Sequence, residues 1–478
     1  MILYFVVFVL LLVACTIATT VDHNNEGLTS IPSVAGATTR LYLTNNKITT
    51  IVSGALDNLP NLIELRLNNN KMTSVGHIQA VGSTLKELYL SGNPLGSIPD
   101  GTFDGLDKLQ KLTLHSCQLK VIPDLSDVGD TLLWLYIYNN KITSLDSESL
   151  APLVALKLFF IDIREVETLK NVTLPALTNV RIYYASTGLT DFEIYTNTIT
   201  KFDVHGKDLT KFPELTGYVE QITYFHLFSI KFSEISAEDL FPLTNLGTLN
   251  LQNCNGDTDI AFPGSPDELL PVYRVYIQNC NLQRFPDFNY LKNSLTHVYV
   301  FRNKITVISQ NDLSGFAKLT YLHVAYNQLT TVAYVPTLKL TYLNLRENNF
   351  TRVPPIVKSL NGTLEIRTND IKSISEREAD YFTLVTSVFL LENFNLTYIS
   401  DLNNLENHTL SIDIRDTGVN LCDCRNAWML QKRENDEVKY DDTSCTNDNT
   451  QWSSVSNFGL DEMFGVCDLS EMTGRKET

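Results

Sequence analysis

Apolar residues recur along this chain with a fixed spacing: positions one, four, six and eleven of a short motif are leucine or another large apolar residue. Clear copies are LIELRLNNNKM (62–72), LKELYLSGNPL (85–95), LQKLTLHSCQL (109–119) and LTYLHVAYNQL (319–329). Because this spacing covers nearly the whole length, we predict one array of repeats, although 478 residues would otherwise suggest roughly three ordinary domains.

The motif defines seventeen units with a mean spacing of about 23 residues. Alternate residues of its L-x-L core should point inward, as in a short β-strand, and stacking the units gives a parallel sheet. Prolines in the return arms, such as Pro99, Pro123 and Pro286, disfavour long helices there. The fourth motif positions are Leu41, Leu65, Leu88, Leu112, Leu135, Phe159, Val180, Phe202, Phe225, Leu249, Val275, Val298, Leu322, Leu343, Leu364, Val388 and Ile412.

This pattern resembles the leucine-rich repeat. The resemblance implies an α/β right-handed solenoid, or horseshoe, with a parallel β-sheet on its concave face and short 3₁₀ or extended segments on its convex face. We expect a signal peptide at 1–18, an N-terminal cap without cysteines at 19–38, repeats over 39–419, a cysteine-rich cap at 420–468 and a short polar tail at 469–478.

Position nine of the motif is usually Asn, whose amide can satisfy buried backbone groups that would each cost about 1–3 kcal/mol unpaired. We call this row the asparagine ladder. Cys117, Cys254 and Cys280 occupy the same position, and we interpret them as buried free thiols that replace Asn. A disulfide between Cys254 and Cys280 is the alternative if the geometry allows it. The ladder residues are Asn46, Asn70, Asn93, Asn140, Asn303, Asn327, Asn348, Asn369 and Asn393.

Four successive units lack the ladder residue and carry Arg164, Ala185, Lys207 and Ile230 instead. Arg and Lys cannot simply replace a buried Asn, so we expect shifted turns between about residues 159 and 230. Sequence drift in a tolerant array is one interpretation. A local change of curvature that shapes a binding site is the other.

The end of the chain, from NLCDCRNAW to GVCDL, resembles the cysteine-rich C-terminal flanking domain of extracellular leucine-rich-repeat proteins such as Slit, Toll ectodomains and variable lymphocyte receptors. The resemblance implies disulfides between Cys422 and Cys445 and between Cys424 and Cys467. The spacing is unusual for zinc ligands. The family's N-terminal disulfide cap is absent, so the first repeat is either covered by an unstapled strand or open to another chain.

Several features predict a secreted, extracellular glycoprotein. The first eighteen residues form an apolar run typical of a signal peptide, and no second run follows, so we expect no membrane insertion after cleavage. The net charge of -17 disfavours nucleic-acid binding. Five N-x-[ST] sequons are candidate glycosylation sites, at Asn171, Asn349, Asn361, Asn395 and Asn407.

Motif positions three, five and seven should project together from the concave face. They are rich in aromatic residues, which supply much of the binding energy at protein interfaces, although strands favour aromatics in any case. Toward the C-terminus, Arg346 and Arg367 form a basic strip with Arg415, and neutralisation by Glu365 and Asp413 is an equal alternative. The predicted partner-binding residues are Trp134, Tyr136, Tyr138, Phe160, Tyr183, Tyr224, His226, Phe228, Tyr276, His297, Tyr299, Phe301, Tyr321, His323, Tyr342, Arg346 and Arg367.

No nucleotide-binding, metalloprotease or hydrolase motif occurs, so we predict no enzyme, no catalytic residues and no cofactor. Five histidines fall on strand positions expected to be exposed, and we assign only two of them, His297 and His323, to neighbouring repeats. We therefore predict surface histidines and no metal site. The five are His115, His205, His226, His297 and His323.

Family members act in cell adhesion, axon guidance, matrix organisation and innate immune recognition, and shared architecture does not choose among these roles. The function we predict is recognition or adhesion, with an extracellular protein or glycoprotein bound on the aromatic concave face. The alternative is a matrix component that self-associates, for example as a homodimer.

Overall fold

The computed structural model falls into two compact units, residues 1–229 with 242–245 (unit 1) and residues 230–241 with 246–478 (unit 2). None of the helices within the described part of the chain has the length and apolar character that crossing a lipid bilayer requires. The structure describes residues 19–142, 147–162, 168–172, 174–183, 191–194, 198–217, 219–254, 260–263, 270–400, 402, 410–419, 426, 429, 438–439, 446–447 and 450–451.

Each repeat forms one coil, consisting of a strand, a tight turn and a return arm. In unit 1 successive coils place their strands side by side in a parallel sheet. The register is regular, with Leu65 facing Leu88 and Leu88 facing Leu112. The strands are β1 (Thr19–Asp22), β2 (Thr38–Tyr42), β3 (Glu64–Arg66), β4 (Glu87–Tyr89), β5 (Lys111–Thr113), β6 (Trp134–Tyr136), β7 (Leu158–Asp162), β9 (Asn179–Tyr183), β11 (Lys201–Leu209) and β13 (Tyr224–Ile230).

The predicted asparagine ladder is confirmed where the structure describes it. The Asn70 side chain accepts a hydrogen bond from the Ile48 amide at 3.0 Å and donates to the Leu43 and Leu67 carbonyls, both at 2.9 Å. One amide thus satisfies backbone groups of its own coil and of the preceding coil. The residue before it, Asn69, has a φ of 54°, a left-handed conformation that asparagine tolerates well.

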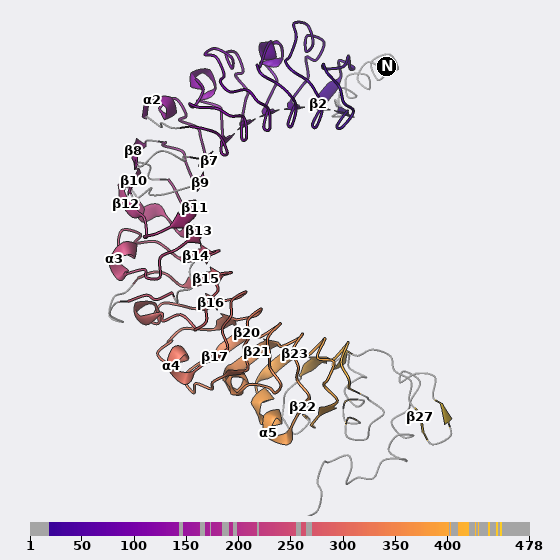
Figure 1. The fold of residues 1–478 in the computed structure, drawn as a ribbon, viewed down its shortest axis with the longest axis vertical. Coiled ribbons are helices and arrows are strands. Elements are labelled where there is room, and N and C mark those ends of the chain that lie inside the picture. Colours follow the sequence, from indigo (N-terminus) through magenta and orange to yellow (C-terminus); the bar gives the residue numbers. More distant parts are fainter. Residues whose placement is uncertain are drawn as a thin grey trace, which may run out of the picture. The chain divides into compact units, whose positions relative to one another are not determined.

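The ladder-free coils of unit 1 contain a second sheet on their return side. Strands β8 (Thr168–Val172), β10 (Asp191–Ile194) and β12 (Glu214–Gly217) pair in parallel, away from β7, β9 and β11 (Figure 1). The inner strands are longer here, since β11 spans nine residues and β5 only three. The extended backbone of β11 thus continues through Lys207, the residue at position nine. Arg164 and Ala185 lie outside the described residues, as does the Lys207 side chain.

Unit 2 repeats the same plan with its own parallel sheet. Its strands are β14 (Thr248–Gln252), β15 (Arg274–Gln278), β16 (His297–Tyr299), β18 (Tyr321–His323), β20 (Leu340–Asn344), β21 (Leu360–Glu365), β23 (Val385–Phe389), β25 (Ser411–Asp413) and β26 (Val438–Lys439). Two-residue return strands pair in parallel, β17 (Val307–Ile308) with β19 (Thr331–Val332) and β22 (Ser373–Ile374) with β24 (Tyr398–Ile399). A two-residue pair, β27 (Thr446–Asn447) and β28 (Thr450–Gln451), is antiparallel.

Helices in the return arms are short, as the prolines predict. Each α-helix in the described ranges has four residues, and Ser236 and Ser309 start two of them with a capping box to an aspartate three residues later. The α-helices are α2 (Ser147–Leu150), α3 (Ala237–Leu240), α4 (Gln310–Leu313) and α5 (Glu376–Ala379). The 3₁₀ segments are η1 (Ile78–Val81), η2 (Ser126–Val128), η3 (Val219–Gln221), η4 (Asn289–Leu291), η5 (Pro355–Ser359) and η6 (Asp380–Phe382).

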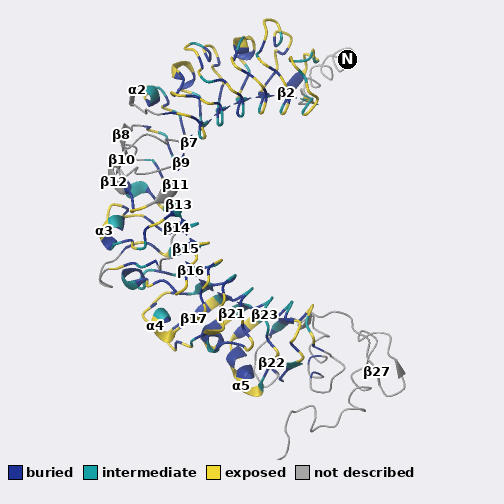
Figure 2. Cartoon of the chain, in the orientation of Figure 1, coloured by how far each residue is buried: buried dark blue, intermediate teal, exposed yellow. Residues whose placement is uncertain are grey.

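The core lies inside the coils. Leu65, Leu67 and Met72 of one coil have no exposed surface, and buried residues follow the inside of each unit while the exposed ones concentrate on the return arms (Figure 2). Burying an apolar side chain of this size contributes roughly 1.5–3 kcal/mol. The fold is thus the predicted solenoid of stacked coils with parallel strands and little helix.

One prediction about position nine is wrong. Cys254 and Cys280 form a disulfide, with their Cα atoms 4.2 Å apart, instead of remaining free thiols. The cause is the register of neighbouring coils: Gln252 of β14 faces Gln278 of β15, so the residues two positions later also lie side by side. Cys117 is the buried free thiol expected there, and burial raises its pKa to about 11. Cys422, Cys424, Cys445 and Cys467 lie outside the described residues.

Candidate functional site

The solvent side of each sheet carries the side chains at motif positions three, five and seven, and we call this surface the strand face. The described aromatic residues predicted for it are half-buried, except His226, which is buried with 7% of its surface exposed. The prediction that His226 is exposed is therefore wrong. The Tyr183 side chain lies outside the described part of the structure.

In unit 2 the strand face carries a continuous row of four tyrosines, Tyr276, Tyr299, Tyr321 and Tyr342, which we call the tyrosine row. The Tyr276 and Tyr299 rings stack at 4.1 Å and the Tyr321 and Tyr342 rings at 4.3 Å, with 5.0 Å between the Tyr299 and Tyr321 centroids. One strand from each of four successive coils supplies a ring. His297 stacks on Tyr321 with 5.2 Å between the ring centroids and so adds a fifth ring beside the row.

The hydroxyls of Tyr299 and Tyr321 remain protonated across the physiological range. Burial and the hydrogen bond with Tyr276 raise the pKa of Tyr299 to about 12, and burial beside Tyr342 and Tyr299 raises the pKa of Tyr321 above its ordinary value. The row therefore presents apolar ring surface together with neutral hydroxyls that can both donate and accept hydrogen bonds. This combination suits recognition of a protein surface.

In unit 1 cations accompany the aromatic rings. The Arg66 guanidinium lies 4.3 Å from the Tyr42 ring centroid, and the Lys111 ammonium lies 4.9 Å from that of Tyr89. Further along, the predicted binding residues Tyr136 and Phe160 meet edge to face at 4.9 Å. The aromatic surface therefore differs between the units: it is interleaved with positive charge in unit 1 and built from stacked tyrosines in unit 2.

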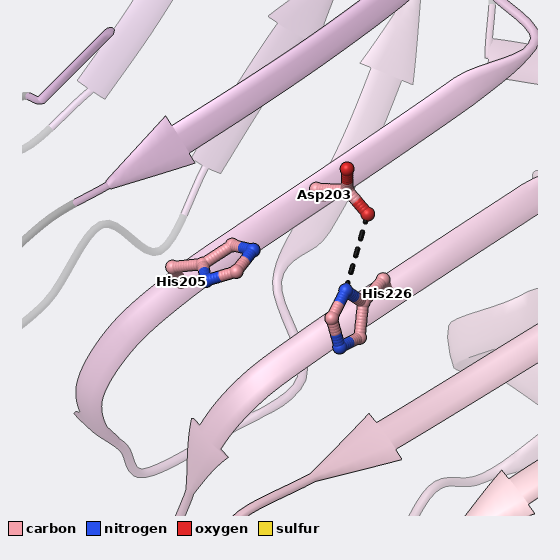
Figure 3. A group of neighbouring side chains, drawn as sticks. All are labelled: Asp203, His205 and His226. Atoms are coloured by element: carbon pink, nitrogen blue, oxygen red, sulfur yellow. Dashed lines mark hydrogen bonds and ion pairs between the residues drawn. The ribbon is translucent and has the colours of Figure 1, made fainter. Parts of the chain in front are cut away.

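A polar cluster interrupts the strand face of unit 1 at Asp203, His205 and His226 (Figure 3). The Asp203 carboxylate accepts hydrogen bonds from both sides. Nδ1 of His226 lies 3.2 Å from its Oδ1, while Nε and Nη2 of Arg181 lie 3.0 and 2.9 Å from its Oδ2. Although burial opposes ionisation, the bonds to His226 and Arg181 lower the pKa of Asp203.

The cluster corrects our assignment of the strand histidines. His205 follows Phe202 and His226 follows Phe225, and these two core positions belong to consecutive repeats, so the two histidines are neighbours just as His297 and His323 are. Their rings meet edge to face at 5.2 Å. The signal was present in the alignment of the repeats, where Asp203 and His226 share motif position five.

The basic strip of unit 2 is neutralised by neighbouring carboxylates. Arg367 lies 3.3 Å from Glu365, Arg346 lies 2.9 Å from Glu347, and Nη2 of Arg415 lies 2.8 Å from Asp413. Two of these pairs are the ones predicted for the neutralisation alternative. A partner that binds Arg346 or Arg367 through an anion has to compete with an acid already in place.

Two hollows lie away from the aromatic columns. One of about 770 Å³ in unit 1 has Lys86 and Lys108 in its wall, and one of about 470 Å³ in unit 2 lies beside Phe394, whose surface is 70% exposed. Of the predicted sequons, Asn349, Asn361 and Asn395 are exposed, whereas Asn407 and the Asn171 side chain lie outside the described residues.

Comparison with known proteins agrees with the coil architecture. Two family models match the chain, both described as leucine rich repeat, over residues 83–128 and 339–360. Osteomodulin from Bos taurus is 24% identical over 41% of this chain and 49% of its own length, and podocan from Mus musculus is 24% identical over 42% of this chain and 34% of its own. The chain thus spans about half or less of the length of these relatives.

Among solved structures, that of the Toll and Spatzle complex from Drosophila aligns with a TM-score of 0.51 at 18% identity. The alignment covers 84% of this chain and 57% of the other. At this identity the likeness concerns the fold alone. The chain therefore has the fold of leucine-rich-repeat proteins, a solenoid of stacked coils with parallel strands.

Proposed function

We propose that this chain is a secreted binding scaffold that recognises an extracellular protein or glycoprotein through the tyrosine row of unit 2. The observation that carries the proposal is the row of contacting rings on the strand face: Tyr276 stacks on Tyr299, Tyr321 stacks on Tyr342, and the Tyr299 and Tyr321 rings meet at a tilt. Tyrosine buries a large area at low entropic cost, and such residues dominate interface energetics. Because the rings support one another, little further ordering is needed on binding.

Three further observations support secretion and partner binding. The N-terminal apolar run is typical of a signal peptide, and Asn349, Asn361 and Asn395 are exposed where a glycan could be attached. The Toll structure that shares this fold was solved as a complex with Spatzle. Neither matching family model describes an enzyme.

The test compares two double variants as baits in the extracellular fluid of the source tissue. Tyr299→Ala with Tyr321→Ala should lower capture of the partner at least tenfold, because both rings are lost from the middle of the row. The matched control, Tyr334→Ala with Phe394→Ala, removes two exposed aromatics outside the strands and should leave capture unchanged. Quantitative mass spectrometry of the eluates gives the measurement.

Equal capture by the two variants would exclude the tyrosine row as the contact surface. Recovery of nothing beyond further copies of this chain would contradict a foreign partner and favour the self-associating matrix component. Melting temperatures of both variants within a few degrees of the parent would show that a difference in capture reflects lost binding and not unfolding.

A further inference from the structure

The Asp203, His205 and His226 cluster combines three metal-ligating side chains at one point of the strand face of unit 1. Each offers one ligand atom, and these atoms lie within 4.8 Å of one another. Figure 3 shows Asp203 and His205 on one strand and His226 on the next, with the side chains gathered on one side of the strands. We propose that these residues bind a divalent transition metal, zinc by preference, leaving coordination positions open to water or a partner group.

The spacing between the first two ligands already suits zinc. Zinc binds imidazole nitrogen at about 2.0–2.1 Å and carboxylate oxygen at about 2.0–2.2 Å, so two ligands of a tetrahedral ion are roughly 3.3 Å apart. Nδ1 of His226 and Oδ1 of Asp203 are 3.2 Å apart. A zinc ion would replace the proton that the two atoms share. His205, whose ligand atom lies within 4.8 Å of the other two, would complete the set after its side chain turns toward the ion.

The protonation states are those that a metal requires. Burial, with smaller contributions from His226 and Arg181, lowers the pKa of His205 to about 4, so its imidazole is neutral at physiological pH, the form that binds a metal. Asp203 is ionised because its pKa is lowered. Two imidazoles with one carboxylate form a borderline donor set, which favours zinc over calcium or magnesium.

The neighbourhood also fits a supported metal site. Nε2 of His226 is buried without a hydrogen-bond partner among the residues that the structure describes, so the ring can turn without breaking a second bond. Arg181 binds Oδ2 and leaves Oδ1 directed at His226, the kind of outer contact that orients a ligating carboxylate. Its positive charge opposes the metal, so the affinity should stay below that of an all-anionic zinc site.

The experiment is a zinc titration of the full chain by calorimetry, after removal of metal with a chelator. We expect one equivalent to bind, with His205→Gln and His226→Gln each weakening the affinity tenfold or more. The control is His297→Gln with His323→Gln, the other neighbouring histidine pair on a strand face, which should bind zinc as the parent does. Failure of the parent to bind below millimolar zinc, or unchanged affinity in His205→Gln, would overturn the proposal.

X-ray absorption of the unmodified zinc-loaded protein keeps the test independent of how the variants fold. Imidazole scattering from two histidines together with oxygen ligands is the expected result. Sulfur ligands would assign the metal to cysteines instead, and an oxygen-only shell would mark an adventitious ion. The proposal does not rest on the tyrosine row, and partner capture and zinc binding are measured separately.

Discussion

The coils before residue 142 and those between 158 and 230 follow the same apolar pattern but satisfy their backbone differently. In the first region the ladder residues, such as Asn70 and Asn140, bind backbone groups of two coils at once. In the second region the ladder is missing, the inner strands lengthen and a return sheet of β8, β10 and β12 forms. The comparison shows that the apolar spacing determines how the coils stack, whereas asparagine at position nine determines the backbone contacts of the ladder coils.

The largest effect should come from removing one ladder amide. Asn70→Ala leaves the Ile48 amide and the Leu43 and Leu67 carbonyls without their partner. Near the lower end of the range of about 1–3 kcal/mol for each of the three groups, we expect unit 1 to lose roughly 3–5 kcal/mol. Urea unfolding, with hydrogen exchange over residues 41–72, measures the loss. Asn69→Gly is the control, because Asn69 is exposed and glycine accepts its positive φ. Equal losses in the two variants would contradict the ladder's role.

A smaller effect is expected where a disulfide occupies the ladder position. Replacing Cys254 and Cys280 together by Ala opens a link across 26 residues and should destabilise unit 2 by roughly 2–4 kcal/mol. Differential scanning calorimetry of the full chain gives the measurement. Cys117→Ala, which removes a free thiol at the same motif position, should cost about 1 kcal/mol. If the double variant lost no more stability than Cys117→Ala, the disulfide would contribute nothing beyond the packing of its side chains.

The smallest effect concerns the pH dependence of unit 2. His323 on its strand face contacts the rings of Tyr299 and Phe301, and burial lowers the pKa of His323 to about 4. Between pH 6.5 and 4 the unfolded chain binds a proton at His323 that the folded chain does not, so stability falls as the pH falls through this window. From pH 7 to pH 5 the loss should be about 1–2 kcal/mol. His323→Gln should flatten this part of the unfolding profile of unit 2, and an unchanged slope would refute the assignment.

Much of the fold and part of the site could be predicted from the sequence. The spacing located the strands, and asparagine at position nine indicated the backbone contacts of Asn70 and Asn327, because a buried turn always has groups that need partners. The tyrosine row follows from alternation along a strand. The stacking distances did not follow, because they depend on rotamers.

The misses have physical causes. The Cys254 and Cys280 disulfide depends on register between coils that are longer than the mean, which spacing alone leaves undetermined. The return sheet of β8, β10 and β12 was not predicted, because its strands lie outside the apolar motif that defines the repeats. The contact between Asp203 and His226 could have been predicted by aligning the repeats, because the two residues share motif position five in consecutive units. It was missed because the histidines were considered as scattered over the chain and were not compared repeat by repeat.

The two-coil reach of each ladder amide has a consequence for how such a chain can change length. Asn93 donates to the Leu67 and Leu90 carbonyls, just as Asn70 donates to those of Leu43 and Leu67. Each coil therefore forms equivalent hydrogen bonds with the coil before it. One whole coil could be duplicated or deleted there with its neighbours still satisfied. A coil between β7 and β13 cannot be duplicated or deleted in this way, because the return strands there pair with one another in their own register. Gain or loss of whole repeats should therefore be confined to the ladder segments.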